Sequence, residues 1–211
     1  RLIRANEADI AVCGGTEACM NIVSLGGFAA ARSLSTGFNW APAQASRPFD
    51  VSRDGFVMGE GAGVLVIEAL SHALARGAKP LAELVGYGTT ADAHHVTSGP
   101  EDGDGARRAM QVAIAQAGIS PLEVRHLNAA GGLGAIFAIL ALRDQVAPPT
   151  LNLGAPDPAG DGIDFVANQA RPMAMDYAIS NGFGFGGVNA SALFRRWTDE
   201  LAGANAREAH N

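Results

Sequence analysis

The sequence has no excess of positive charge. Its 211 residues include 15 Lys and Arg against 21 Asp and Glu, which gives a formal net charge of −6 and a pI near 5.3. Nucleic acids and anionic membrane surfaces attract proteins through clustered basic residues. We therefore expect neither a nucleic acid nor a membrane among the partners of this protein.

Long hydrophobic runs are also missing. The longest apolar run, residues 135–142, is far shorter than the about 20 residues that a transmembrane helix needs. Residues 1–7 contain neither the apolar core nor the small-residue cleavage site of a secretory signal. These two absences predict a cytoplasmic protein without a membrane span.

Cysteine is scarce. Cys13 and Cys19 have the spacing of neither a Cys-x-x-Cys redox pair nor a zinc knuckle, and a catalytic cysteine is the less favoured alternative because no histidine lies near either in sequence. His94 and His95 follow Asp92, but adjacent histidines point in different directions and do not predict a metal site. We expect reduced cysteines, no metal and no cofactor.

The sequence does contain alternating strand and helix patterns, and 48% of its residues are hydrophobic, enough for one substantial core. The apolar run 8–13 is typical of a strand buried on both faces, and residues 1–7 resemble the last turns of a helix. We expect further strands at 81–88 and 124–128 and helices at 28–34, 69–76 and 106–117. A capping box is expected at 120–123, and a helix that is apolar on all sides at 129–143. This alternation predicts an α/β fold built of packed layers.

A glycine-rich stretch near the carboxyl end organises this pattern. Residues 181–189 contain four glycines and two phenylalanines between two extended runs, 176–180 and 190–194, so they predict a turn between paired strands. Glycine permits close approach of other groups, and an aromatic ring between glycines has little to hold it rigid. The stretch therefore favours a binding turn with a movable ring; the alternative is an ordinary hairpin turn whose Phe side chains lie in the core.

The same glycines match the G-x-G-x-x-G spacing of dinucleotide-binding turns. That fingerprint requires a helix directly after the glycines, with its amino terminus facing the pyrophosphate. Residues 188–194 have strand-forming content instead. We do not expect this turn to bind a nucleotide.

Several motifs together resemble a known enzyme family. They are Ala45–Asp50 (ASRPFD), Arg53–Gly63 (RDGFVMGEGAG), Asp92–His95 (DAHH), Pro148–Asn152 (PPTLN) and Phe183–Asn189 (FGFGGVN). In this order they are similar to the β-ketoacyl-acyl-carrier-protein synthases of type II fatty-acid synthesis. The resemblance implies a thiolase-like α/β/α/β/α sandwich, with residues 1–78 ending the amino-terminal half, 79–197 forming the carboxyl-terminal half and 198–211 a polar tail.

The resemblance also implies a reaction, a decarboxylative Claisen condensation. An acyl chain passes from acyl-carrier protein to a cysteine, malonyl-carrier protein loses CO₂, and the resulting carbanion attacks the thioester. Two histidines and backbone amides stabilise the developing negative charge, and no metal or organic cofactor takes part. The implied partners are acyl-carrier protein with its phosphopantetheine-linked groups and a second copy of the chain in a homodimer.

Individual site residues follow from the same resemblance. Phe185 matches the gate between acyl pocket and cysteine, and its backbone N–H matches an oxyanion donor; ordinary core packing is the alternative. The other matched positions are substrate-binding: Phe28 in the acyl-pocket wall, Arg32 as a carrier-facing cation, Thr97 near the pantetheine arm, and Phe183, Gly186 and Asn189 in the turn. A solvated loop hydroxyl at Thr97 and a solvated cation at Arg32 are the alternatives.

The chain departs from the family pattern in three ways. The family's nucleophilic cysteine precedes the segment that begins at Arg1, and the segment with both catalytic histidines and a lysine is missing after Asn128, where His126 matches neither histidine. Either the sequence joins pieces of a longer enzyme or the polypeptide lacks these segments; uncovered strand and helix ends favour the former. Gly134 replaces a usual glutamate, which leaves open a non-catalytic subunit of the chain-length-factor type. A thiolase-fold enzyme acting on coenzyme A esters is a third, weaker hypothesis.

Overall fold

The computed structural model describes residues 2–128 and 131–198, so that almost all of the predicted polar tail lies outside the described residues. The chain forms two compact units. The first comprises residues 1–15, 63–145 and 174–211, and the second comprises residues 16–62 and 146–173. Each is described by itself.

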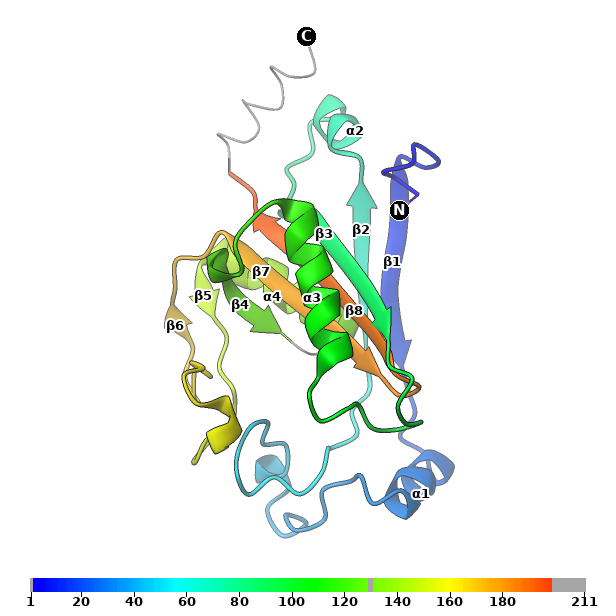
Figure 1. The fold of residues 1–211 in the computed structure, drawn as a ribbon, viewed down its shortest axis with the longest axis vertical. Coiled ribbons are helices and arrows are strands. Elements are labelled where there is room, and N and C mark those ends of the chain that lie inside the picture. The colour runs from blue at the N-terminus through cyan, green and yellow to red at the C-terminus, as the bar shows by residue number, and fades with distance from the viewer. Residues whose placement is uncertain (1, 129–130, 199–211) are drawn as a thin grey trace. The chain divides into compact units, whose positions relative to one another are not determined.

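A four-stranded sheet forms the centre of the first unit, in the order β3-β8-β7-β4 (Figure 1). Its strands are β3 (Ala82–Ala91), β4 (Val124–Asn128), β7 (Tyr177–Gly184) and β8 (Val188–Arg196). β7 and β8 form an antiparallel hairpin, β3 runs antiparallel to β8, and β4 runs parallel to β7. The predicted pairing of the two carboxyl-terminal runs is therefore confirmed.

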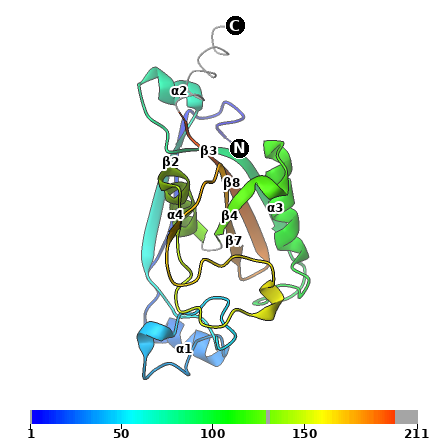
Figure 2. The ribbon, with the colours of Figure 1, turned by 90° about the vertical axis from the view of Figure 1, so that its left-hand side faces the viewer.

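Two helices of 14 residues cover opposite faces of this sheet, α3 (Asp104–Ala117) and α4 (Gly131–Asp144) (Figure 2). α3 comes very close to β3 because β3 carries glycines where the two elements meet. A Cβ atom on Gly86 or Gly88 would lie 2.0 Å from the carbonyl oxygen of Ala113 or Ala109, respectively. Both alanines are fully buried. Small residues on both elements thus set the position of α3.

A second sheet pairs β1 (Ile10–Glu17) with β2 (Gly61–Glu68), and within the first unit α4 packs against it. A Cβ atom on Gly63 would lie 3.0 Å from Cδ1 of Ile136 and 3.1 Å from Cδ2 of Leu133. α4 therefore lies between two sheets, and α3, the large sheet, α4 and the β1-β2 pair form four successive layers (Figure 2). The predicted layered α/β sandwich is confirmed.

Two expectations about burial were wrong. Val12 of β1 is 71% exposed and Val66 of β2 is 64% exposed, so this pair is not buried on both faces; within the described residues one face lacks cover. α4 is not buried all round either, because Phe137 and Leu133 are 53% and 42% exposed while Ala138 and Leu142 are fully buried. Apolar composition identified these elements but not how many of their faces are covered.

Short helical elements complete the first unit. α2 (Leu70–Ala75) is followed by Gly77 with a φ of +72°, and Gly118 ends α3 with a φ of +67°. The 3₁₀ turn η2 (Pro121–Glu123) carries the predicted capping box, in which the Glu123 carboxylate accepts from the Ser120 N–H at 2.7 Å and the Ser120 hydroxyl accepts from the Leu122 N–H. These local predictions are confirmed.

The second unit contains α1 (Ile22–Ala30), two 3₁₀ turns, η1 (Pro42–Gln44) and η3 (Pro158–Gly160), and a short antiparallel pair, β5 (Val146–Ala147) and β6 (Arg171–Pro172). The helix expected at residues 28–34 starts earlier. The Asn21 side chain accepts hydrogen bonds from the N–H groups of Val23 and Ser24 and caps α1, and Arg32 already has a φ of +54°. The Asn21 cap, which the sequence prediction did not include, sets the start of α1.

A buried carboxylate joins distant segments of the second unit. Asp50 is 3% exposed and accepts hydrogen bonds from the Ser52 hydroxyl and N–H, from Ala155 N–H at 3.0 Å and from Gly154 N–H at 2.8 Å. These donors hold the pKa of Asp50 well below its usual range. The carboxylate therefore holds the backbone after β5 against the segment before β2.

Candidate functional site: a cavity beside the Phe185 turn

The hairpin turn is tighter than the sequence suggested. β7 extends to Gly184, which pairs with Val188, so that only residues 185–187 connect the strands. Gly186 and Gly187 have φ angles of +87° and +75°, which glycine adopts without strain. Residues 181–184, expected in the turn, belong to the strand.

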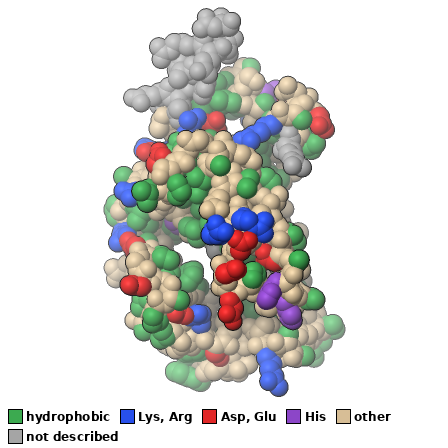
Figure 3. Space-filling view, in the orientation of Figure 1, with side chains coloured by type: hydrophobic (Ala, Val, Ile, Leu, Met, Phe, Trp, Pro, Cys, Tyr) green, Lys and Arg blue, Asp and Glu red, His purple; other side chains and the backbone are tan. Residues whose placement is uncertain are grey.

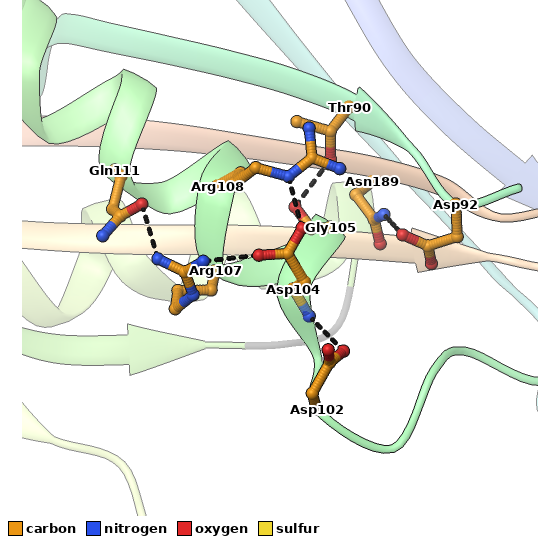
Figure 4. A network of polar contacts seen from close by, with 9 residues as sticks. All are labelled: Thr90, Asp92, Asp102, Asp104, Gly105, Arg107, Arg108, Gln111 and Asn189. Atoms are coloured by element: carbon orange, nitrogen blue, oxygen red, sulfur yellow. Dashed lines mark hydrogen bonds and ion pairs between the residues drawn. The ribbon is translucent and has the colours of Figure 1, made fainter. Parts of the chain in front are cut away.

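Three hydrogen bonds attach this turn to the loop after β3. Gly186 N–H donates to the Val96 carbonyl at 2.7 Å, Asp92 N–H donates to the Gly187 carbonyl at 2.7 Å, and the Asn189 amide Nδ2 donates to Asp92 Oδ1 at 2.8 Å. A Cβ atom on Gly187 would lie 2.4 Å from the Asp92 carbonyl oxygen. The turn and the loop therefore form one packed assembly, part of which is drawn in Figure 4.

The loop is in turn packed on the first turn of α3. The Thr90 hydroxyl donates to the Gly105 carbonyl at 2.6 Å, and a Cβ atom on Gly105 would lie 1.7 Å from Asp92 Oδ1 (Figure 4). Only glycine fits there without displacing the Asp92 carboxylate. Asp92 thus lies between α3 and the hairpin.

Charged side chains surround the start of α3. Asp104 accepts from Arg108 and Arg107, and these two arginines lower the pKa of its carboxyl (Figure 4). In Figure 3, basic and acidic side chains accordingly lie next to each other over the start of α3 and the preceding loop. Because each arginine is already paired with a carboxylate, this surface is mixed in charge and not strongly basic.

A cavity of about 400 Å³ opens beside the turn. Phe183 and Phe185 on its wall are 49% and 57% exposed, so neither ring is sealed in the core. The cavity is lined by Asp92, Thr97, Ser98, Gly99, Pro100, Gly103, Ala106, Phe183, Gly184, Phe185, Gly187 and Asn189. Its lining therefore combines two apolar rings of the hairpin with a polar loop.

The structure brings most of the predicted site residues together. Phe183, Phe185, Thr97 and Asn189 line the same cavity, and Gly186 lies in the turn between them. The Thr97 N–H donates to His95 Nδ1 at 3.2 Å, and Asn189 is 3% exposed with its amide on Asp92. The functional roles of these residues stay predictions.

Phe28 and Arg32 belong to the second unit. The Phe28 ring packs edge-to-face against Phe56, with centroids 5.1 Å apart, and Arg32 follows the end of α1. Their assignment to an acyl pocket and a carrier-facing surface stays a prediction.

Sequence reasoning missed the positioning roles of Asp92 and Gly105. Beyond its place in the Asp92–His95 motif, Asp92 was considered there only with His94 and His95 as a metal site. Among the described residues, no group of three or more His, Cys, Asp or Glu side chains could hold a metal ion. The partner of Asp92 lies 97 residues away, at Asn189. A single sequence carries no signal for such a contact.

Two polar atoms on β4 are buried without a hydrogen-bond partner in the described part of the chain, Nε2 of His126 and Oδ1 of Asn128. Burial lowers the pKa of His126. Buried polar atoms are normally paired with protein groups or with ordered water.

Comparison with known proteins gives one consistent family. A family model described as the N-terminal domain of β-ketoacyl synthase matches residues 1–73, and one described as the C-terminal domain matches residues 81–131. The chain is 44% identical to 3-oxoacyl-acyl-carrier-protein synthase 2 of Rhizobium meliloti (strain 1021) and 42% identical to the mitochondrial 3-oxoacyl-acyl-carrier-protein synthase of Arabidopsis thaliana. These alignments cover 94% and 92% of this chain but 56% and 52% of the relatives, so the chain spans about half of their length.

The alignment with the Rhizobium relative is longer than the chain itself. It extends over 239 positions, whereas 94% of 211 residues is about 198, so about 41 aligned positions of the relative have no counterpart here. The relative therefore has internal residues that this sequence lacks.

Solved structures agree with the sequence relatives. The chain superimposes with a TM-score of 0.88 and 29% identity, over 93% of this chain and 58% of the other, on AntDE:AntF, a type II PKS acyl-carrier protein in complex with its ketosynthase bound to the hexaketide. The layers of this chain are those of the thiolase fold of ketosynthases, as the sequence motifs implied. Together, the two family models, the relatives and this fold show that the chain belongs to the β-ketoacyl synthase family.

Proposed function

We propose that this chain is part of a β-ketoacyl-acyl-carrier-protein synthase, an acyltransferase that elongates fatty acids by decarboxylative Claisen condensation. The observation that carries the proposal is the open cavity beside the Phe185 turn, in a chain that belongs to this family. A thioester substrate needs a slot that admits an extended, partly apolar arm. The two phenylalanine rings and the polar loop that line the cavity provide such a slot.

The described residues supply the walls of the site in this proposal, not its reactive groups. Phe185 and Phe183 flank the acyl thioester, Thr97 faces the pantetheine arm, and Gly186 and Gly187 let the backbone approach the reacting carbonyl. The cysteine nucleophile, two histidines and a lysine belong to residues that precede Arg1 or follow Asn128 in the family. The about 41 unmatched positions of the Rhizobium relative support a missing internal segment. We also propose that residues 1–78 end the amino-terminal half of the ketosynthase fold and that residues 79–197 form its carboxyl-terminal half.

The proposed partner is acyl-carrier protein. It is supported by the structural relative AntDE:AntF, in which an acyl-carrier protein is in complex with its ketosynthase. We further propose a cytoplasmic homodimer. Among the described residues, no helix has both the length and the apolar character that crossing a bilayer requires.

A non-catalytic partner subunit is the weaker alternative. It rests on Gly134 of α4, where the family usually has a glutamate. The two relatives at 44% and 42% identity both carry the name of a synthase, which favours the enzyme.

The test uses the intact polypeptide, sequenced by mass spectrometry and assayed with acyl- and malonyl-acyl-carrier protein. We expect a cysteine upstream of Arg1, a His-Gly pair after Asn128, release of CO₂ and formation of a β-ketoacyl-carrier product. A polypeptide with neither feature and no product would overturn the proposal. If the polypeptide is active only with free coenzyme A thioesters, its substrate is a coenzyme A ester and not an acyl-carrier-protein thioester.

A further inference from the structure

Trp40, in the second unit, is 78% exposed, although tryptophan side chains are largely buried in most folded proteins. It lies on the segment between α1 and η1. The residues that line the cavity beside the Phe185 turn do not include it. The proposed condensation site therefore gives no reason for this ring to be on the surface.

The indole ring is held in place in spite of its exposure. Its Nε1 donates to the Gly37 carbonyl at 2.9 Å, and the ring stacks on Phe38 with centroids 6.5 Å apart and planes 29° from parallel. The guanidinium carbon of Arg47 lies 4.3 Å from the centroid of Phe38, and Arg47 also donates to the Ser52 hydroxyl at 2.7 Å. Phe38, Trp40 and Arg47 thus form one assembly, which we call the Trp40 platform.

The backbone that leads to the platform is fixed as well. The Asp54 carboxylate accepts from the Ser35 hydroxyl, from Thr36 N–H at 2.9 Å and from Gly37 N–H at 2.7 Å. These donors lower the pKa of Asp54 to about 2, so the carboxylate stays ionised at neutral pH. Since the Gly37 carbonyl accepts from the indole, this carboxylate also fixes the position of the ring.

A rigid, exposed ring of this kind suits binding to another protein. Tryptophan and arginine are enriched among the residues that contribute most to protein–protein affinity. A ring that is already fixed loses little conformational freedom when a partner covers it. Because the indole N–H is already bonded to Gly37, the ring offers the partner an apolar face, which fits an apolar side chain.

The charge of the segment narrows the choice of partner. Residues 18–49 contain Arg32 and Arg47 but no Asp or Glu, although the chain as a whole has a formal net charge of −6. The Arg32 side chain is exposed and makes no hydrogen bond or ion pair with the described residues. The segment therefore fits a partner that presents negative charge next to an apolar side chain.

Arg32 and Trp40 are close enough to contact one partner. Trp40 comes eight positions after Arg32, which is about 28 Å at most for an extended chain. A protein interface of standard size buries about 800 Å² per partner, a patch about 30 Å across. One docked protein therefore reaches both side chains.

We infer that the Trp40 platform is a docking point for acyl-carrier protein, with an apolar side chain of the carrier on the indole and an anionic group of the carrier beside Arg32. The carrier has such a group by its chemistry, the phosphodiester of its phosphopantetheine arm. The inference rests on the proposed function, from which it takes the partner. It adds an aromatic anchor, Trp40, that the family resemblance does not supply.

The experiment measures binding of acyl-carrier protein to the intact polypeptide by calorimetry, without substrates. Trp40→Ala should raise the Kd by about tenfold or more, and Trp40→Phe, which keeps a ring, should restore most of the affinity. Leu122→Ala on η2 is the matched control, because Leu122 is an apolar side chain at 85% exposure outside this segment; its Kd should equal that of the unaltered polypeptide. Unfolding midpoints confirm that each variant is folded.

Salt dependence tests the contribution of charge. Arg32→Gln should slow association severalfold at low ionic strength and reduce the dependence of the Kd on salt. Arg125→Gln removes the same charge at an exposed position on β4 and is the control. Equal effects of the two substitutions would show that only net charge matters and would contradict docking at this segment.

The outcomes separate this inference from the proposed function. If Trp40→Ala binds the carrier as tightly as the unaltered polypeptide, the inference is wrong and the proposed function stands. If sedimentation shows that Trp40→Ala abolishes self-association and leaves carrier binding intact, the platform is a contact between copies, and the inference is also wrong. If the carrier binds through Trp40 but no β-ketoacyl product forms, the condensation fails and the docking point stands.

Discussion

The Asn189 side-chain amide donates a hydrogen bond from Nδ2 to Oδ1 of Asp92 at 2.8 Å, across 97 residues of sequence. Asn189 lies at the start of β8 and is 3% exposed, and Asp92 begins the loop after β3. The bond therefore holds the wall of the cavity that carries Phe183 and Phe185 against the loop that carries Thr97.

Removing the acceptor should destabilise the chain. Asp92→Ala leaves the buried Asn189 amide without its partner, which costs about 1–3 kcal/mol of the free energy of unfolding. Urea unfolding measures the loss. Glu101→Gln in the same loop, an exposed position, is the control and should change stability by less than about 0.5 kcal/mol. Equal effects of the two substitutions would contradict the role of Asp92.

Gly105→Ala should be destabilising even though alanine favours helices more than glycine does. The added Cβ would lie 1.7 Å from Asp92 Oδ1 and 2.6 Å from Asn189 Nδ2, so we expect a loss of about 1–3 kcal/mol. In the Asp92→Ala background the loss should shrink, because one of the two clashing groups is gone. A double-mutant cycle by urea unfolding tests this, and strict additivity would refute the contact.

His126 should make the chain less stable in mild acid. Burial lowers its pKa below the ordinary value of 6.5, so the unfolded chain binds a proton at pH values where the folded chain does not. The free energy of unfolding therefore falls as the pH drops below about 6.5 toward the folded pKa. His126→Gln should flatten this dependence in urea titrations between pH 7 and about 5. Gln169→Asn, at an exposed position without a titratable side chain, should leave the slope unchanged; a flattened slope in that control would assign the effect elsewhere.

Phe185→Ala should separate activity from stability. The ring is 57% exposed, so the unfolding midpoint should change little, whereas kcat/KM for condensation by the full polypeptide should fall by about tenfold or more when the thioester loses its wall. Leu122→Ala, at 85% exposure, is the control for both measurements. Unchanged kcat/KM in Phe185→Ala would remove this ring from the site.

The sequence by itself determined the elements whose signals are local. Gly118 ends α3, the capping box starts at Ser120, β4 covers residues 124–128 as expected, and glycines close the β7-β8 hairpin. Each of these depends on backbone preferences and hydrogen bonds within a few residues, which composition and spacing express directly.

Only the tertiary structure decided which residues meet. The register of β3, β8 and β7 brings Asp92 to Asn189, and the glycines of β3 bring α3 close enough for Gly105 to contact both. The exposure of β1 and of one side of α4 likewise depends on how the layers stack. Packing is a property of surfaces far apart in the chain, and no local pattern of residues encodes it.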